Sequence, residues 1–212
     1  MADWVTISSL ATAGGTLVLA VATFGSVRSA NRAARAAERS MLAALRPLLL
    51  PSRLQDPQQK VGFADDKWLV VPGGGAAAEV GDDAVYLALS LRNVGTGLAV
   101  LHGWRFYPER ILGGDSGPAP LEEFHRLSRD LYIPAGDFGF WQGALRDPAS
   151  AEFAAARGPV QAGGSVTVDL LYGDQEGGQR VVTRFVLRPR ADTSEWLGTV
   201  SRHWNIDRDD PR

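Results

Sequence analysis

The 212-residue sequence contains no cysteine. Disulfide scaffolds, thiolate zinc sites, cysteine nucleophiles and thiol redox chemistry are therefore excluded. Lysine is almost absent, because Lys60 and Lys67 are the only two, and the preference for arginine, alanine and glycine is typical of a GC-rich bacterial genome. The net charge of -2 at pH 7 lacks the basic excess that phosphate neutralisation usually brings. We expect no nucleic-acid partner.

Histidine is also scarce, and His102, His125 and His203 do not have the four-residue spacing that places two metal ligands on one helix face. Phosphate-binding loops and the lipase-type serine motif are absent. The segment Gly114–Pro118 is similar to the sequence around a chymotrypsin-like nucleophile, but the only upstream histidine is too close for two barrels to form around the pair. We interpret it as a loop and expect no catalytic residue, cofactor or metal, and hence no enzyme.

The clearest feature is an uncharged run from Trp4 to Val27. At about 1.5 Å per residue, a helix of this length crosses a hydrocarbon core of roughly 30 Å. We therefore assign residues 1–27 to a transmembrane anchor that inserts in the lipid bilayer. A cleaved signal peptide is one alternative, although only Asp3 precedes the run and no basic residue does. A buried core helix is another, although such helices are seldom apolar on every side for this length.

Charge on either side of the run predicts its orientation. Four arginines follow it directly: Arg28, Arg32, Arg35 and Arg39. Basic residues stay on the cytoplasmic side of a span, and the short N-terminal tail offers only an aspartate. We expect a single-pass protein of the cell membrane with its N-terminus outside and its C-terminal domain in the cytoplasm.

Residues 28–52 are rich in strong helix formers and predict a juxtamembrane helix that continues the anchor, until Pro47 and Pro51 end or kink it. Five arginines form a stripe of roughly 60° on one side: Arg28, Arg32, Arg35, Arg39 and Arg46. The opposite side collects Ala30, Ala33, Ala34, Ala37, Met41, Ala44, Leu45 and Leu48. We expect Arg28 and Arg32, which lie nearest the span, to contact lipid headgroups. The alternative is a solvated arginine face, with the apolar face packed on the following domain.

Small residues within the span indicate where two helices could pack. Ser8, Ala11 and Gly15 share one side, and the last two form a small-xxx-small pair that allows close backbone approach. We therefore expect a weak homodimer. The alternative is that such residues are simply frequent in membrane helices.

After a polar linker at residues 53–60, alternating periodicity predicts a cytosolic β domain over residues 61–212. We expect strands at 69–71, 84–93 and 98–107, a hairpin over 166–189 around Gly177 and Gly178, and helical insertions at 120–131 and 149–157. The fold class is mainly β, as an immunoglobulin-like β-sandwich, with an open barrel as the alternative. Six aromatic residues are expected to fill the core rather than line a ligand cleft: Trp104, Phe106, Tyr132, Phe138, Phe140 and Trp141.

Three segments carry a resemblance: RPLLLPSR at 46–53, YLALSLRNVGTGLAVLHGW at 86–104 and RHWNID at 202–207. Together they resemble a family of small, uncharacterised bacterial single-span membrane proteins with a β domain after the anchor. The resemblance implies the architecture and transfers no functional residue. We expect a membrane-tethered, non-catalytic interaction or scaffold module for a protein partner that the sequence does not identify. The alternatives are an enzyme or small-ligand sensor with an unrecognised pocket, and an exported β domain after cleavage or inverted insertion.

Overall fold

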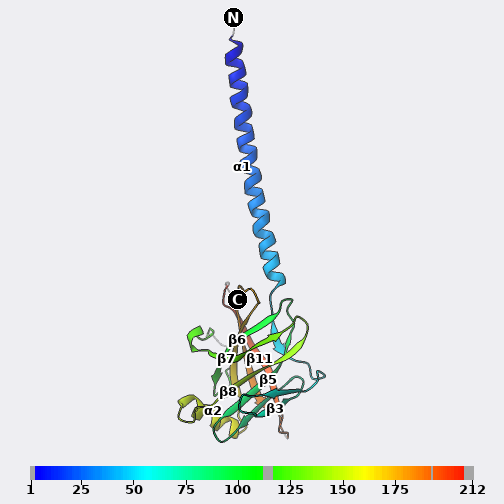
Figure 1. Cartoon of the computed structure of the whole chain (residues 1–212), viewed down its shortest axis with the longest axis vertical. Coiled ribbons are helices and arrows are strands. Elements are labelled where there is room, and N and C mark those ends of the chain that lie inside the picture. Colours follow the sequence, from blue (N-terminus) through cyan, green and yellow to red (C-terminus); the bar gives the residue numbers. More distant parts are fainter. Residues whose placement is uncertain (1–2, 112–116, 192, 208–212) are drawn as a thin grey trace. The chain divides into compact units, whose positions relative to one another are not determined.

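The computed structural model describes residues 3–111, 117–191 and 193–207, and the chain divides into two compact units, Met1–Ala43 and Ala44–Arg212 (Figure 1). The first unit is almost entirely one helix, and the second is a β domain. Most of the protease-like loop, from Gly114 to Ser116, lies outside the described residues.

Helix α1 spans Trp4–Ala44. Its hydroxyl side chains bond back to the helix, since Thr12 Oγ1 donates to the Ser8 carbonyl at 2.8 Å and Thr16 Oγ1 to the Thr12 carbonyl at 2.9 Å. These bonds satisfy polar groups that would otherwise oppose insertion into lipid. The expected continuity of the anchor with the juxtamembrane helix is present over all of α1.

The juxtamembrane helix nevertheless ends earlier than residue 52. Pro47 has no N–H to donate and disfavours helical geometry at the residue before it, so α1 stops at Ala44. Residues Leu49–Pro51 instead form strand β1. Arg46 therefore does not continue the arginine stripe; its guanidinium donates to Oδ1 of Asn205 in the β domain.

The β domain contains eleven strands among its described residues: β1 Leu49–Pro51, β2 Gln59–Gly62, β3 Trp68–Val71, β4 Gly75–Val80, β5 Val85–Asn93, β6 Ala99–Tyr107, β7 His125–Ile133, β8 Phe138–Leu145, β9 Val166–Gly173, β10 Val181–Pro189 and β11 Trp196–Asn205. A 3-10 turn, η1, covers Leu121–Glu123, and helix α2 covers Ala151–Gln161. The mainly β prediction is confirmed.

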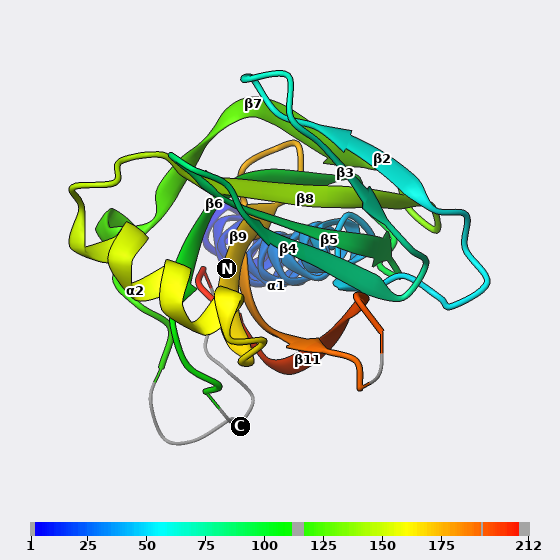
Figure 2. The same cartoon turned by 90° about the horizontal axis from the view of Figure 1, so that it is seen from below.

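Nine of these strands form one antiparallel sheet that curls around its own core (Figure 2). The hydrogen-bonded path runs β8-β5-β4-β11-β10-β9-β6-β7, and β1 also pairs with β5. The shortest pairing in the sheet is between β4 and β11, where only Gly75 and Ala76 pair with Leu197 and Trp196. An immunoglobulin-like sandwich has two separate sheets, and that specific arrangement is not confirmed.

The core fills the inside of the curl, and β5 shows how the sequence places it. Val85, Leu87 and Leu89 alternate along β5 and are fully buried inside. The other face of β5 is also buried, because the β2–β3 hairpin packs Val61 and Val71 against that side.

Two further expectations need correction. The segment 53–60 is not a free linker: Asp56 forms an ion pair with Arg92 at 2.6 Å, and β2 already begins at Gln59. The helical insertion expected at 120–131 is mostly strand β7, because its backbone pairs with β6. The other insertion is confirmed as α2, which begins where the Ser150 hydroxyl accepts a hydrogen bond from the Phe153 N–H. The β9–β10 hairpin is also confirmed.

Candidate functional site

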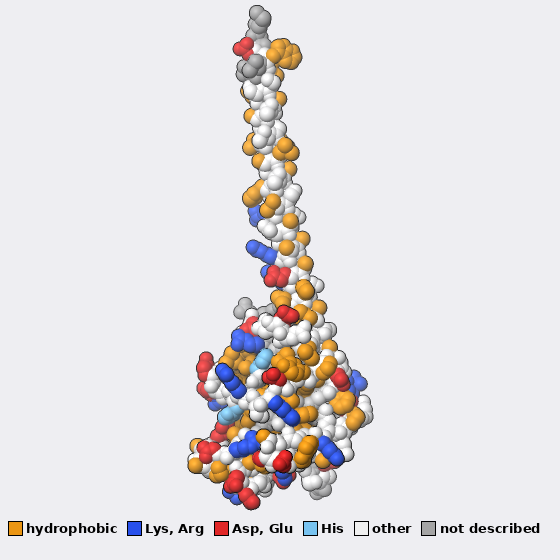
Figure 3. Space-filling model, in the orientation of Figure 1, with side chains coloured by type: hydrophobic (Ala, Val, Ile, Leu, Met, Phe, Trp, Pro, Cys, Tyr) orange, Lys and Arg blue, Asp and Glu red, His pale blue; other side chains and the backbone are white. Residues whose placement is uncertain are grey.

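Helix α1 is long and apolar enough, over Ile7–Leu42, to cross a membrane. None of its most apolar stretch is buried in the structure, which argues against the core-helix alternative. Figure 3 shows hydrophobic and uncharged side chains along the upper part of α1, with the first basic side chains further along. The helix therefore has the physical properties of an anchor.

The residues expected to act on α1 are all exposed. Arg28 and Arg32 line a shallow groove together with Phe24, Val27 and the neighbouring stripe residue Arg35. A second groove, lined by small side chains, includes Ser8. It does not include Ala11 or Gly15, although a Cβ on Gly15 would meet nothing within 4 Å.

Immediately after α1, the chain is fixed to the β domain by a group of residues that we call the socket: Arg46, Pro47, Leu48, Asn93, Val94, Gly95, Thr96, Gly97 and Asn205. Buried Asn93 organises it. Its Oδ1 accepts from Leu48 N at 3.1 Å and Gly95 N at 3.0 Å, and its Nδ2 donates to the carbonyls of Gly97 at 2.7 Å and Ile133 at 3.0 Å. All four hydrogen-bonding positions of this amide are used.

The glycines of the socket are required by close backbone approach. A Cβ on Gly97 would lie 1.7 Å from the Leu45 carbonyl oxygen, and one on Gly95 would lie 2.4 Å from that of Arg46. Both distances are far inside van der Waals contact. The three segments that carry the family resemblance thus meet at one place, where they hold residues 45–48 against the β domain.

A buried hydrogen-bond chain continues from the socket into the core. The Leu49 N–H donates to the Tyr172 hydroxyl at 3.1 Å, and that hydroxyl lies 2.9 Å from Thr183 Oγ1. Thr183 Oγ1 in turn lies 2.6 Å from Nδ1 of His203. Burial raises the pKa of Tyr172, so its hydroxyl stays protonated and available to this chain. Strand β1 is therefore tied to β9, β10 and β11.

The outer face of the sheet carries a charged row that sequence reasoning missed. Arg105, Asp169, Arg184 and Arg202 lie directly opposite one another on β6, β9, β10 and β11. The Arg184 guanidinium donates two hydrogen bonds of 2.7 Å, one to each carboxylate oxygen of Asp169, and both residues are almost fully buried. Desolvation opposes the charge of Arg184, but the hydrogen bonds and charge of Asp169 outweigh it and the pKa of Arg184 is raised.

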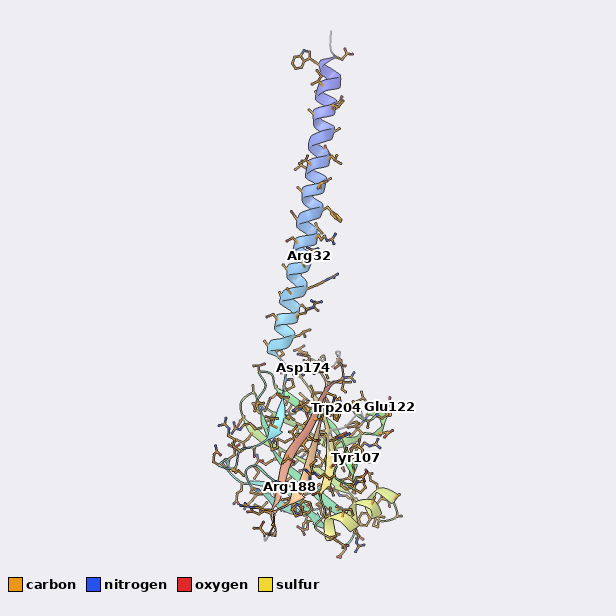
Figure 4. The ribbon with its side chains drawn as sticks, turned by 180° about the vertical axis from the view of Figure 1, so that it is seen from behind. Arg32, Tyr107, Glu122, Asp174, Arg188 and Trp204 are labelled. Carbon is orange, nitrogen blue, oxygen red and sulfur yellow. The ribbon has the colours of Figure 1, made fainter. Side chains whose placement is uncertain are left out.

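Two aromatic rings separate the three guanidinium groups of this row. The Arg105 and Arg184 Cζ atoms each lie 5.1 Å from the ring centroid of Tyr107, and Arg184 and Arg202 lie 4.8 and 5.8 Å from that of Trp204. Figure 4 labels Tyr107 and Trp204. We call the alternating set Arg105–Tyr107–Arg184–Trp204–Arg202 the ladder. These distances are typical of cation–π contacts.

A small pocket of about 140 Å³ lies where β7 and β8 separate. His125 forms part of its wall, stacks on Trp104 with ring centroids 4.8 Å apart, and pairs with Glu152 of α2 at 2.8 Å. The other histidines do not join it. Burial lowers the pKa of His102, and no group of three or more His, Asp or Glu among the described residues is arranged to hold a metal ion.

The aromatic residues divide between core and surface. Trp104, Phe106 and Trp141 are buried as expected, whereas Tyr132 is 54% exposed. Trp68 and Val70 of β3 were not singled out from the sequence, and they are 63% and 52% exposed. Both line a groove of about 470 Å³ beside β4 and the start of β11. Trp68 and Val70 therefore place two exposed apolar side chains side by side in one groove.

Comparison with protein-family models, curated proteins and solved structures found no significant match to this chain. The residues of the site are therefore interpreted from their own chemistry. For Asp169 and Arg184 a sequence signal did exist, because Asp169 is the single charge in β9, Arg184 stands within the apolar stretch of β10, and a turn at 177–178 places the two opposite one another. No comparable signal linked Arg105 or Arg202 to them.

Proposed function

We propose that this chain is a membrane-tethered interaction or scaffold module, in which α1 is the anchor and the β domain binds a protein partner. The observation that carries the proposal is that α1 has an exposed apolar stretch long enough to cross a membrane and is followed directly by a compact domain. The resemblance to small bacterial single-span proteins supports the same proposal, as do the exposed apolar side chains of Trp68 and Val70 in the groove beside β4.

The second candidate is a small-ligand sensor or enzyme that uses the pocket beside His125 and Trp104. The pairing of a histidine with Glu152 favours it, since such pairs can transfer protons. The pocket's 140 Å³ is small against the 300 to 1,000 Å³ that is usual for ligand sites, so we place this function second.

The proposed topology is one span of the cell membrane, with the N-terminus outside and the β domain in the cytoplasm. It rests on Arg28, Arg32 and the two arginines that follow them, set against Asp3 at the other end of the span. Protease added to intact spheroplasts is expected to leave the β domain whole, and detergent is expected to make it cleavable. Digestion before lysis would contradict this orientation.

The interaction itself is tested by photo-crosslinking from the groove. A photoreactive amino acid in place of Trp68 is expected to capture a discrete protein in native membranes. The same label in place of Leu54, which is 76% exposed and does not line the groove, is the matched control. Equal labelling from both positions would contradict a partner site at the groove.

A further inference from the structure

The three arginines of the ladder outnumber the carboxylates paired with them among the described residues, and the excess positive charge lies at one end. Asp169 neutralises Arg184, and Glu123 forms an ion pair with Arg105. Arg202 has no carboxylate partner among the described residues. Within the described part of the chain, one positive charge therefore remains beside Trp204.

Register gives Arg202 no counter-charge within the sheet. Arg202 lies directly opposite Arg184 across β10 and β11, and the carboxylate of Asp169 is already paired with Arg184. The Nε atom of Arg202 is buried and has no hydrogen-bond partner, whereas buried polar atoms normally have one. The rest of the side chain is partly exposed, so a ligand can reach it.

The local backbone holds Arg202 in this position. The register between β10 and β11 shifts after Arg184, which leaves Ser201 as an extra residue in β11. Such bulges redirect neighbouring side chains and are frequent beside functional sites. The Ser201 hydroxyl donates a hydrogen bond to the Ile111 carbonyl at 3.4 Å. Further along β11, Trp204 packs with Leu171 and Val182.

We propose that Arg202, supported by Trp204, binds a carboxylate side chain of an acidic segment in a protein partner. A planar guanidinium matches a carboxylate with two parallel hydrogen bonds, as Arg184 and Asp169 already show within the same row. A single carboxylate also matches the single excess charge, whereas a phosphate dianion would exceed it. This inference rests on the proposed interaction function and names the chemistry of one contact.

The test uses the full chain in detergent micelles and a fluorescein-labelled hexaglutamate peptide, with binding followed by anisotropy at constant ionic strength. Arg202→Gln is expected to weaken binding by about 10- to 100-fold, since hydrogen bonds to a charged group are lost. Arg188→Gln is the matched control. Arg188 is an exposed arginine on the face of β10 that also carries Arg184, and its substitution removes the same charge as Arg202→Gln (Figure 4). It is expected to change affinity by less than about threefold.

Arg202→Lys keeps the charge and removes the planar guanidinium, so this variant is expected to bind the peptide with intermediate affinity. It also serves as a second variant in case the Arg202→Gln chain does not fold. Equal effects of the Arg202 and Arg188 substitutions would overturn the proposal, as would absence of peptide binding. Displacement of the peptide by inorganic phosphate at lower concentration than by acetate would assign the site to phosphate instead. Partner capture at Trp68 that persists in the Arg202→Gln chain would leave the interaction function standing while this contact fails.

Discussion

Removing residues 1–43 and removing residues 1–52 are expected to give two different proteins. The first cut follows the division between the two compact units and leaves every strand of the β domain in place. The second cut also removes β1 and the socket residues Arg46–Leu48. We expect the 44–212 fragment to fold and the 53–212 fragment to be strongly destabilised.

The magnitude follows from what β1 contributes. Leu49 is fully buried, and its loss resembles a large-to-small core substitution, which costs about 2 to 5 kcal/mol. Several hydrogen bonds disappear as well, and three of them join residues 48 and 49 to groups outside β1: Leu48 N to Asn93, Leu49 N to Tyr172, and Val94 N to the Leu48 carbonyl. At about 0.5 to 1.5 kcal/mol each, they bring the loss to about 4 to 9 kcal/mol. Such a loss is comparable to the whole stability of a typical domain.

Urea unfolding followed by tryptophan fluorescence and circular dichroism measures the difference. The 44–212 fragment carrying Leu49→Ala is the intermediate case, with a cost of about 2 to 5 kcal/mol and an unchanged dependence on urea. If the 53–212 fragment unfolded at the same urea concentration as the 44–212 fragment, the assignment of β1 to the domain would be refuted.

Three other substitutions test separate parts of the structure. Asn93→Ala should lower the free energy of unfolding by at least about 2 kcal/mol in urea titration, because it leaves buried backbone groups of the socket unpaired, and a loss below 0.5 kcal/mol would contradict that role. Arg184→Met should cost about 3 to 5 kcal/mol by the same measurement, because Asp169 stays buried without its partner, and the double variant with Asp169→Leu should recover part of this. Gly15→Ile should reduce energy transfer between labelled chains in bilayers if the helices pair there, and unchanged transfer would make α1 only an anchor.

Alternation and turn residues predicted the parts of the fold whose pairing is local. Strands β5 and β6 follow alternating apolar residues with a glycine-containing turn between them, and β9 and β10 form a hairpin around Gly177. The prediction of the long N-terminal helix needed only its length, its composition and the absence of charge over Trp4–Val27. In each case the residues that determine the structure are neighbours in the sequence.

Elements fixed by distant partners were predicted less well. Three leucines between Pro47 and Pro51 have neither helical nor strand period, and only pairing with β5 makes them β1. Leu127 and Leu131 of β7 are four residues apart, which favours a helix locally, yet pairing with β6 extends the segment. Tertiary contacts decided both cases, as they often do when local preference is weak.

The same limit applies to the charged row on the outer face of the sheet. Asp169 and Arg184 belong to one hairpin, so their pairing could be predicted from the turn between them. Arg105 becomes their neighbour only because β6 joins the far side of β9, although the two strands are about sixty residues apart in the sequence. A row of side chains that crosses four strands is therefore visible only once the order of the strands is known.

The segments that carry the family resemblance have a structural explanation of their own. Gly95 and Gly97 are required because residues 45–48 cross their loop too closely for a side chain, while Asn93 pairs backbone groups there and Asn205 accepts from the Arg46 guanidinium. These residues fix the segment that follows α1 to the β domain, and their hydrogen-bonding groups are used in doing so. In the proposed interaction function, a partner is therefore recognised by groups that the fold leaves unsatisfied. On the described surface, the exposed Trp68 and the unpaired end of the ladder at Arg202 are such groups.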